Sequence, residues 1–139
     1  MNIKFLPQQY PFQLIDEVIT YKPNEYLLAL KNITSSEWTF DQRDATLSHY
    51  PETLMIESAA QLGVLFFKMN QDAVRAGGQD KKIFLGKVKA EFFDQVFPGD
   101  QIKLELLSSR MLASGGIFNV NILKDKQKIA EVELFCSIR

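Results

Sequence analysis

Residues 51–75, with the sequence PETLMIESAAQLGVLFFKMNQDAVR, decide the fold, because apolar side chains occupy nearly every side of a helix drawn through them. Pro51 suits the first turn of a helix, and Glu52 favours the positive end of the helix dipole. The pair Gly77-Gly78 is a helix stop, so we predict a helix from about Pro51 to Arg75. A helix that is apolar all round has to be wrapped by other elements of the fold.

The segments on either side of this helix have the composition of β-strands. Runs rich in β-branched and aromatic residues occur at 12–20, 26–33, 83–93, 101–110, 116–123 and 128–138. Short turn sequences at 22–25, 98–100, 114–116 and 124–126 separate them, which predicts antiparallel neighbours. Residues 35–50 have neither the period of a strand nor that of a helix, and we expect an irregular segment there. The order predicts an α+β fold in which an antiparallel sheet wraps around one long helix.

Size and charge limit the class of protein. The length of 139 residues is that of one ordinary domain, so we expect a single domain over residues 1–139. The chain carries 16 Lys and Arg against 17 Asp and Glu, a net charge of -1, and so lacks the basic field that binds nucleic-acid phosphates. The single cysteine, Cys136, excludes an internal disulfide and a multi-cysteine zinc site, and the single histidine, His49, removes most histidine metal sites. We expect no metal, no organic cofactor and no nucleic-acid partner.

The apolar segments do not predict a membrane protein. The most apolar stretch, Leu54 to Phe67, is 14 residues long and includes Glu57, so it is too short and too polar to span a bilayer. The residues before Gln13 lack an apolar run after a basic start, and no secretory signal is expected. Both observations favour a cytoplasmic location.

Glu57 and Gln61 are the first candidates for chemistry, because they lie four residues apart on one face of the predicted helix. That face also carries apolar residues such as Leu54 and Leu65, and an unpaired carboxylate is costly in such surroundings. One hypothesis is that Glu57 opens onto a cavity and acts as a general acid. The alternative is a structural carboxylate held by helix-end donors or by an arginine such as Arg43.

His49 and Cys136 are further candidates. His49 precedes the predicted helix, where a neutral imidazole could act as a base, or where it is a packed or exposed capping residue. A solvated charge cluster is an equally good interpretation of the nearby charged residues Asp41, Arg43 and Asp44. Cys136 lies in an apolar strand without a basic neighbour that would activate it, so we interpret it as a small core residue.

Four sequence motifs carry a family resemblance. They are LPQQYPFQLID at 6–16, KNIT at 31–34, LMIESAAQ at 54–61 and FPGDQ at 97–101. Together they resemble the 3-hydroxyacyl-[acyl-carrier-protein] dehydratase family of type II fatty-acid synthesis, over nearly the whole chain. The resemblance implies the hot-dog fold, an antiparallel sheet wrapped around one long helix. It also implies a dimer with active sites between two subunits, which use a histidine from a Gly-His-Phe-Pro loop and a glutamate on the central helix.

The resemblance identifies Glu57 with the family's glutamate, but the histidine position departs from the family. Without a gap, that position is occupied by Arg43, and arginine does not normally lose its proton to become a base. His49-Tyr50-Pro51 is similar to the family's His-Phe-Pro and aligns with it if six residues are deleted. Glu52 stands where the family has a glycine whose amide helps to hold the thioester carbonyl, which puts that support in doubt.

Residues 90–95 depart from the family in charge. Relatives usually carry arginine and lysine there, which dock the acidic carrier protein, whereas this chain has Glu91 and Asp94. Docking would then fall to Lys81, Lys82, Lys87 or Lys89, or to a companion subunit. Gln61, Arg43 and Glu52 are expected to contact substrate, and Phe66, Phe67 and Phe92 either line an acyl tunnel or serve as core packing.

Three functions follow from these residues. The first is a dehydratase that binds 3-hydroxyacyl or enoyl thioesters of acyl carrier protein or coenzyme A, with Glu57 as acid and His49 as the replacement base. The second is a non-catalytic subunit that pairs with a dehydratase homologue and lends Glu57 to a shared site. The third is an acyl thioesterase in which Glu57 activates water. The first two functions require a homodimer and a heterodimer, respectively.

Overall fold

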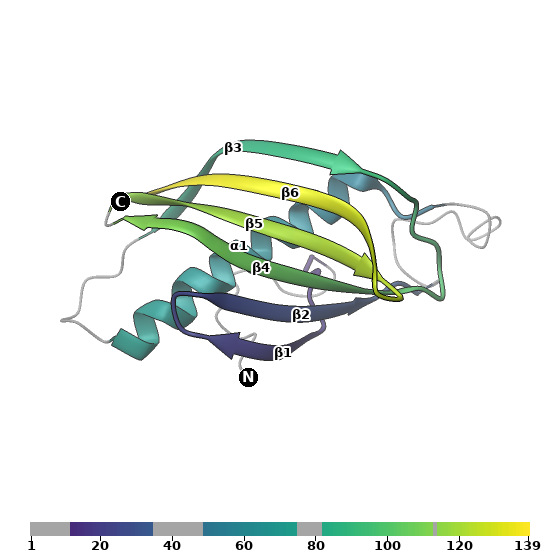
Figure 1. Cartoon of the computed structure of the whole chain (residues 1–139), viewed down its shortest axis with the longest axis horizontal. Helices are drawn as coiled ribbons and strands as arrows, with labels where there is room; N and C mark the ends of the chain where they lie inside the picture. The colour runs from purple at the N-terminus through teal and green to yellow at the C-terminus, as the bar shows by residue number, and fades with distance from the viewer. Residues whose placement is uncertain (1–11, 35–48, 75–81, 113) are drawn as a thin grey trace.

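The structure is a computed structural model that describes residues 12–34, 49–74, 82–112 and 114–139. Its elements follow one another as β1 (Glu17–Lys22), β2 (Tyr26–Asn32), α1 (Glu52–Val74), β3 (Ile83–Phe92), β4 (Gln101–Leu112), β5 (Gly115–Lys124) and β6 (Gln127–Ile138). The strands form one six-stranded antiparallel sheet in the order β1-β2-β4-β5-β6-β3 (Figure 1). This arrangement confirms the predicted α+β class.

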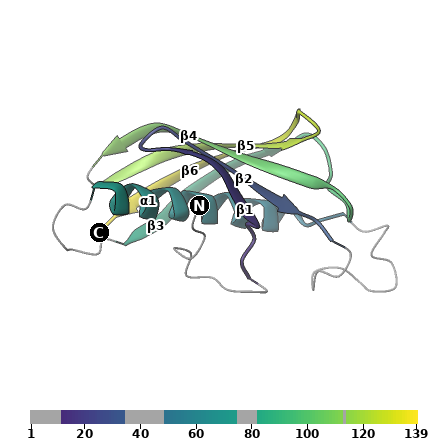
Figure 2. The same ribbon diagram turned by 90° about the horizontal axis from the view of Figure 1, so that it is seen from below.

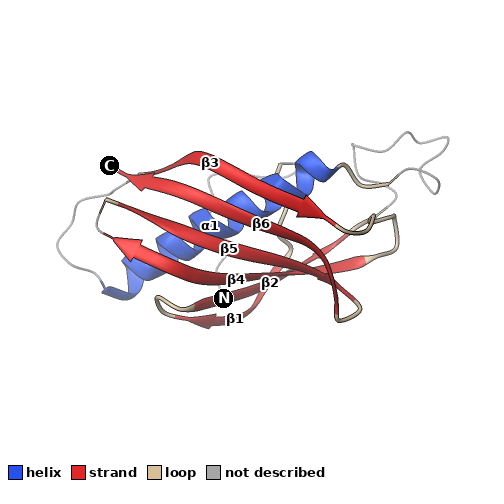
Figure 3. Cartoon of the chain, turned by 45° about the horizontal axis from the view of Figure 1, so that its top comes forward, coloured by secondary structure: helices blue, strands red, loops and turns tan. Residues whose placement is uncertain are grey.

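Helix α1 lies against one face of the curved sheet, which arches over it (Figures 2 and 3). The helix starts as predicted, with the carbonyl of Pro51 accepting hydrogen bonds from the amides of Leu54 and Met55. The core between helix and sheet contains fully buried side chains from both layers, including Met55, Leu62, Phe66, Leu104 and Phe118. Burial of this apolar area supplies the main driving force for the fold.

Two turns agree with the sequence prediction. At the turn between β1 and β2, Asn24 has a φ of 63° and the amide of Glu25 bonds to the carbonyl of Lys22. At the turn between β5 and β6, Asp125 and Lys126 have φ angles of 50° and 68°, as expected for a tight hairpin turn.

The prediction that segments 83–93 and 101–110 are neighbours is wrong. β3 pairs with β6 at the far edge of the sheet, three strand positions from β4. The link between them contains residues 93–100, and Phe93 donates to Ile129 while Gly99 donates to Ile33. Eight extended residues reach about 26 Å, which exceeds the roughly 14 Å across three strand spacings. The link therefore crosses the end of the sheet instead of forming a hairpin.

The first predicted strand is also displaced. We expected it at 12–20, whereas β1 begins at Glu17. The main chain of Phe12 and of Leu14 bonds to the side chain of Gln61 on α1. These bonds fix the entering chain against the helix.

Candidate functional site

Glu57 lies in the second turn of α1 with its side chain exposed. Its Oε1 accepts a hydrogen bond of 3.2 Å from Nε2 of Gln61, one helical turn further along. Within the described part of the chain, Gln61 is the one polar partner of this carboxylate. The carboxylate is therefore positioned by the helix and accessible to a second molecule.

Gln61 is 1% exposed and its amide makes two further hydrogen bonds. Its Oε1 accepts from the amide of Leu14 at 2.8 Å, and its Nε2 donates to the carbonyl of Phe12 at 2.8 Å. Sequence reasoning identified Gln61 as a neighbour of Glu57 but missed its role as an anchor for residues 12–14. A polar amide on an otherwise apolar helix face could have indicated this role, because a buried amide needs hydrogen-bond partners.

His49 is exposed at the start of α1, and its Nε2 lies 3.3 Å from Oε2 of Glu52. The neighbouring Tyr50 is buried and its amide donates to the carbonyl of Val96 at 2.6 Å, which anchors this end of the helix. The structure thus brings together two of the predicted site residues, His49 and Glu52, as a surface pair.

The structure does not bring His49 to Glu57. Among the described residues, Glu52 is the polar partner of His49 and Gln61 is that of Glu57. Glu52 precedes Glu57 by five residues, which corresponds to about 7.5 Å along the helix axis and about 140° around it. The histidine pair and the exposed carboxylate therefore occupy different sides of α1.

The predicted aromatic residues have different surroundings. Phe66 is fully buried and packs edge to face with Tyr21 and Phe118, with ring centroids 6.3 Å and 5.7 Å apart. Phe67 is also buried. Phe92, at the end of the edge strand β3, is partly buried against the core. Phe66 therefore contributes core packing here, and the acyl tunnel remains a prediction.

Of the two acidic residues at 90–95, Asp94 has a basic partner. Asp94 lies 3.8 Å from Nζ of Lys124, which is also 3.6 Å from Asp100 and donates to the carbonyl of Gln95. Glu91 is exposed on β3. Arg43 and Lys81 lie outside the described residues.

Cys136 is partly buried, and burial raises the pKa of its thiol from 9.0 to about 11. A thiol with such a pKa is protonated at neutral pH and is a poor nucleophile. This agrees with the interpretation of Cys136 as a core residue.

In the described ranges, no group of three or more His, Cys, Asp or Glu side chains is arranged to hold a metal ion. No helix in those ranges is long and apolar enough to cross a membrane.

Known proteins resemble this chain over nearly its whole length. The FabA-like domain family matches residues 6–133. The 3-hydroxyacyl-[acyl-carrier-protein] dehydratase FabZ of Thioalkalivibrio sulfidiphilus is 34% identical over 139 residues, which cover 97% of this chain and 92% of the relative. The dehydratase heterocomplex ApeI:P from Xenorhabdus doucetiae is a structural neighbour with a TM-score of 0.83 and 14% identity, covering 100% of this chain and 91% of that chain. A mutant thioesterase, PA1618 from Pseudomonas aeruginosa, is a structural neighbour with a TM-score of 0.66 and 11% identity. The match covers 87% of this chain and 78% of the thioesterase chain.

Proposed function

Because the chain belongs to the FabA-like family and is a dehydratase-like hot-dog protein, we propose that it works as one subunit of a heterodimeric dehydratase. It binds a 3-hydroxyacyl or enoyl thioester beside Glu57, and a second hot-dog subunit supplies the catalytic histidine. The thioester is carried by acyl carrier protein, the carrier in the names of the relatives. A cytoplasmic location is part of the same proposal.

One observation supports this proposal above the others: the exposed Glu57 is separated from the chain's single histidine. A dehydratase needs an acid and a base at one substrate, within hydrogen-bond reach of the transferred protons. In this chain the candidate acid bonds to Gln61 and the candidate base bonds to Glu52. Because Arg43 stands at the family's histidine position when the chain is matched without a gap, a second copy of this chain would not place a histidine there, and we assign the base to a different hot-dog subunit.

The reaction assigns one step to each group. The histidine of the second subunit removes a proton from the carbon next to the thioester carbonyl, and the electron pair forms the carbon–carbon double bond. The carbon–oxygen bond breaks as Glu57 donates a proton to the leaving hydroxyl, which departs as water. Covering Glu57 with a second subunit and an acyl chain would provide the apolar site in which a carboxyl group can serve as an acid.

Strand β3 is the surface that we assign to the second subunit. It is a ten-residue edge strand that pairs with β6 on one side. Phe84 and Leu85 on β3 are each 46% exposed, and natural proteins rarely leave a long apolar edge uncovered. Antiparallel pairing with β3 of a second hot-dog subunit about a two-fold or pseudo-two-fold axis would cover it and continue the sheet.

The test compares this chain alone, a histidine-bearing dehydratase homologue from the same organism, and the two co-expressed. Turnover of a 3-hydroxyacyl carrier-protein thioester is measured with free-thiol release, which reports thioesterase activity. We expect a heterodimer on size-exclusion chromatography and a rate for the chain alone at least about 10²-fold below that of the pair. His49→Ala and the matched variant Glu52→Gln should leave the rate of the pair unchanged.

Two results would overturn the proposal. Turnover by this chain alone that His49→Ala abolishes would make it a self-sufficient dehydratase with a relocated base. Thiol release without formation of an enoyl product would make it a thioesterase.

A further inference from the structure

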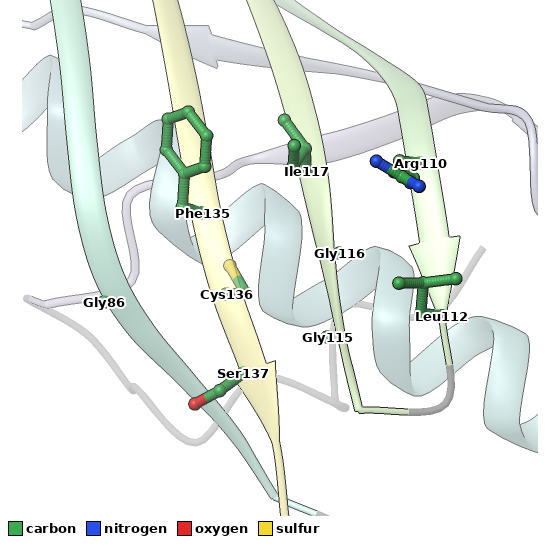
Figure 4. A pocket seen from close by; sticks show the side chains of 9 residues that line it. All are labelled: Gly86, Arg110, Leu112, Gly115, Gly116, Ile117, Phe135, Cys136 and Ser137. Atoms are coloured by element: carbon green, nitrogen blue, oxygen red, sulfur yellow. The ribbon is translucent and has the colours of Figure 1, made fainter.

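A groove of about 420 Å³ lies on the face of the sheet opposite α1 (Figure 4). It sits where β3 begins and β4 and β6 end. Ile117 and Phe135 point to this outer face, because their neighbours Phe118 and Leu134 are buried against the helix and side chains alternate along a strand. The groove is lined by Gly86, Arg110, Leu112, Gly115, Gly116, Ile117, Phe135, Cys136 and Ser137.

Glycines create this groove. Gly86 lies at the register shift of β3, and Gly115 and Gly116 begin β5 on the other side of β6. A Cβ atom on Gly115 would overlap the carbonyl oxygen of Cys136, so no larger residue fits there without a backbone shift. The floor between the glycines is apolar, formed largely by Ile117 and Phe135.

Basic side chains lie on two sides of the groove. The Nζ atoms of Lys87 and Lys89 lie 5.4 Å and 5.7 Å from the centroid of the same Phe135 ring, and Arg139 lies 5.2 Å from that of Phe84. Arg110 lines the opposite side. In the described part of the chain, none of these four cations forms an ion pair with a carboxylate. Two ammonium groups over one ring repel each other, so an anionic partner would be favoured here.

The spacing of the cations selects the kind of partner. Arg110 is on β4 and the two lysines are on β3, with β5 and β6 between them. The two ammonium groups lean over Phe135 on β6, so the charges lie on both sides of an apolar floor. Carboxylates on successive turns of an acidic helix recur about every 5.4 Å and can face both sides while an apolar side chain enters the groove.

We infer that an acidic helix of acyl carrier protein docks on this outer face, with one of its apolar side chains in the groove and its carboxylates against Lys87, Lys89 and Arg110. This rests on the proposed function. The segment that relatives use for docking is unsuited here, because Asp94 is acidic and already engaged by Lys124.

The test measures docking separately from catalysis. Fluorescently labelled apo acyl carrier protein, which lacks the thioester arm, is titrated with the heterodimer at about 50 mM salt, where surface charges are weakly screened. The double variant Lys87→Glu/Lys89→Glu and the single variant Arg110→Glu should each raise Kd about tenfold. Lys103→Glu is the matched control, because Lys103 is exposed on the same face of β4 away from the groove, and its Kd should change less than about twofold.

A second readout separates this inference from the proposed function. Turnover of an N-acetylcysteamine thioester, which needs no carrier, should be the same in Arg110→Glu, which lies on β4 away from the proposed subunit contact, and in the wild type. An unchanged Kd in the groove variants, or an equal rise in Lys103→Glu, would overturn the docking surface even if that thioester is turned over. Absence of turnover with every thioester would overturn the proposed function, while the Kd series would still decide the docking surface.

Discussion

Gln61 holds Glu57: Nε2 of the buried amide lies 3.2 Å from Oε1 of the exposed carboxylate, and the same amide is bonded to the main chain of Phe12 and Leu14. The candidate acid is thereby coupled to the segment that enters the fold. A displacement of residues 12–14 would therefore change the position of Glu57 through the side chain of Gln61.

Replacement of Gln61 by methionine should destabilise the protein by about 2–3 kcal/mol, because it keeps the volume but removes the hydrogen bonds to the amide of Leu14 and the carbonyl of Phe12. Urea unfolding followed by circular dichroism measures this. Gln13→Ala is the control, since the bond from Gln13 to Ile15 is local and partly buried, and it should cost less than about 1 kcal/mol. Equal losses in the two variants would contradict the anchoring role.

Alanine at Gly115 should destabilise the sheet by roughly 1–3 kcal/mol, because its Cβ would overlap the carbonyl oxygen of Cys136 and β5 would have to move. At Gly86 a Cβ would lie 3.5 Å from the carbonyl oxygen of Phe135, an ordinary contact, so Gly86→Ala should change the unfolding free energy by less than about 0.5 kcal/mol. Thermal unfolding of both variants makes the comparison. Similar midpoints would show that β5 adjusts freely at Gly115.

Alkaline pH should destabilise the fold through Cys136 and Tyr26. Burial raises the pKa of Cys136 from 9.0 to about 11, and burial together with the adjacent Glu105 raises that of Tyr26 from 10.0 to about 12. Both groups are held neutral in the folded state, so their contribution is complete below the ordinary pKa and is lost as pH rises towards the folded value. Tm should therefore fall between about pH 9 and 12, and less steeply in Cys136→Ala/Tyr26→Phe. An equally steep fall in the double variant would contradict the assignment.

The pair of His49 and Glu52 should contribute little to stability, because both side chains are well exposed and surface pairs typically contribute about 0–1 kcal/mol. His49→Ala should leave Tm within about 2 °C of the wild type. A larger loss would show that His49 is part of the anchor at the start of α1, together with Tyr50.

The sequence was sufficient to predict α1 and most strand positions, because these depend on local patterns. A continuous apolar run follows Pro51, and the predicted helix differs from Glu52–Val74 by one residue at each end. The strand that pairs with β3 could not be predicted from the sequence. Whether β3 pairs with β4 or with β6 depends on the path of residues 93–100 across the end of the sheet. Turn sequences alone do not distinguish a hairpin from such a crossing.

The candidate site was only partly predictable for a similar reason. The spacing of Glu57 and Gln61 placed them together, since four residues make about one helical turn. The partners of Gln61 are 47 and 49 residues away in sequence, and no local pattern indicates contacts over that separation. The groove depends on four strands, so the sequence predicted Lys87 and Lys89 as candidate docking residues but did not predict the groove or the place of Phe135 in it.

The most direct test of the central claim, that Glu57 completes a site with another subunit's histidine, is a complementation assay. The histidine-bearing homologue is made inactive by replacing its own central-helix carboxylate with an amide, then co-expressed with this chain, and dehydration of a 3-hydroxyacyl carrier-protein thioester is measured. We predict that activity returns with wild-type chain and with His49→Ala, and does not return with Glu57→Gln. Failure of the wild-type chain to restore activity in a purified heterodimer, or restoration by Glu57→Gln, would contradict the account.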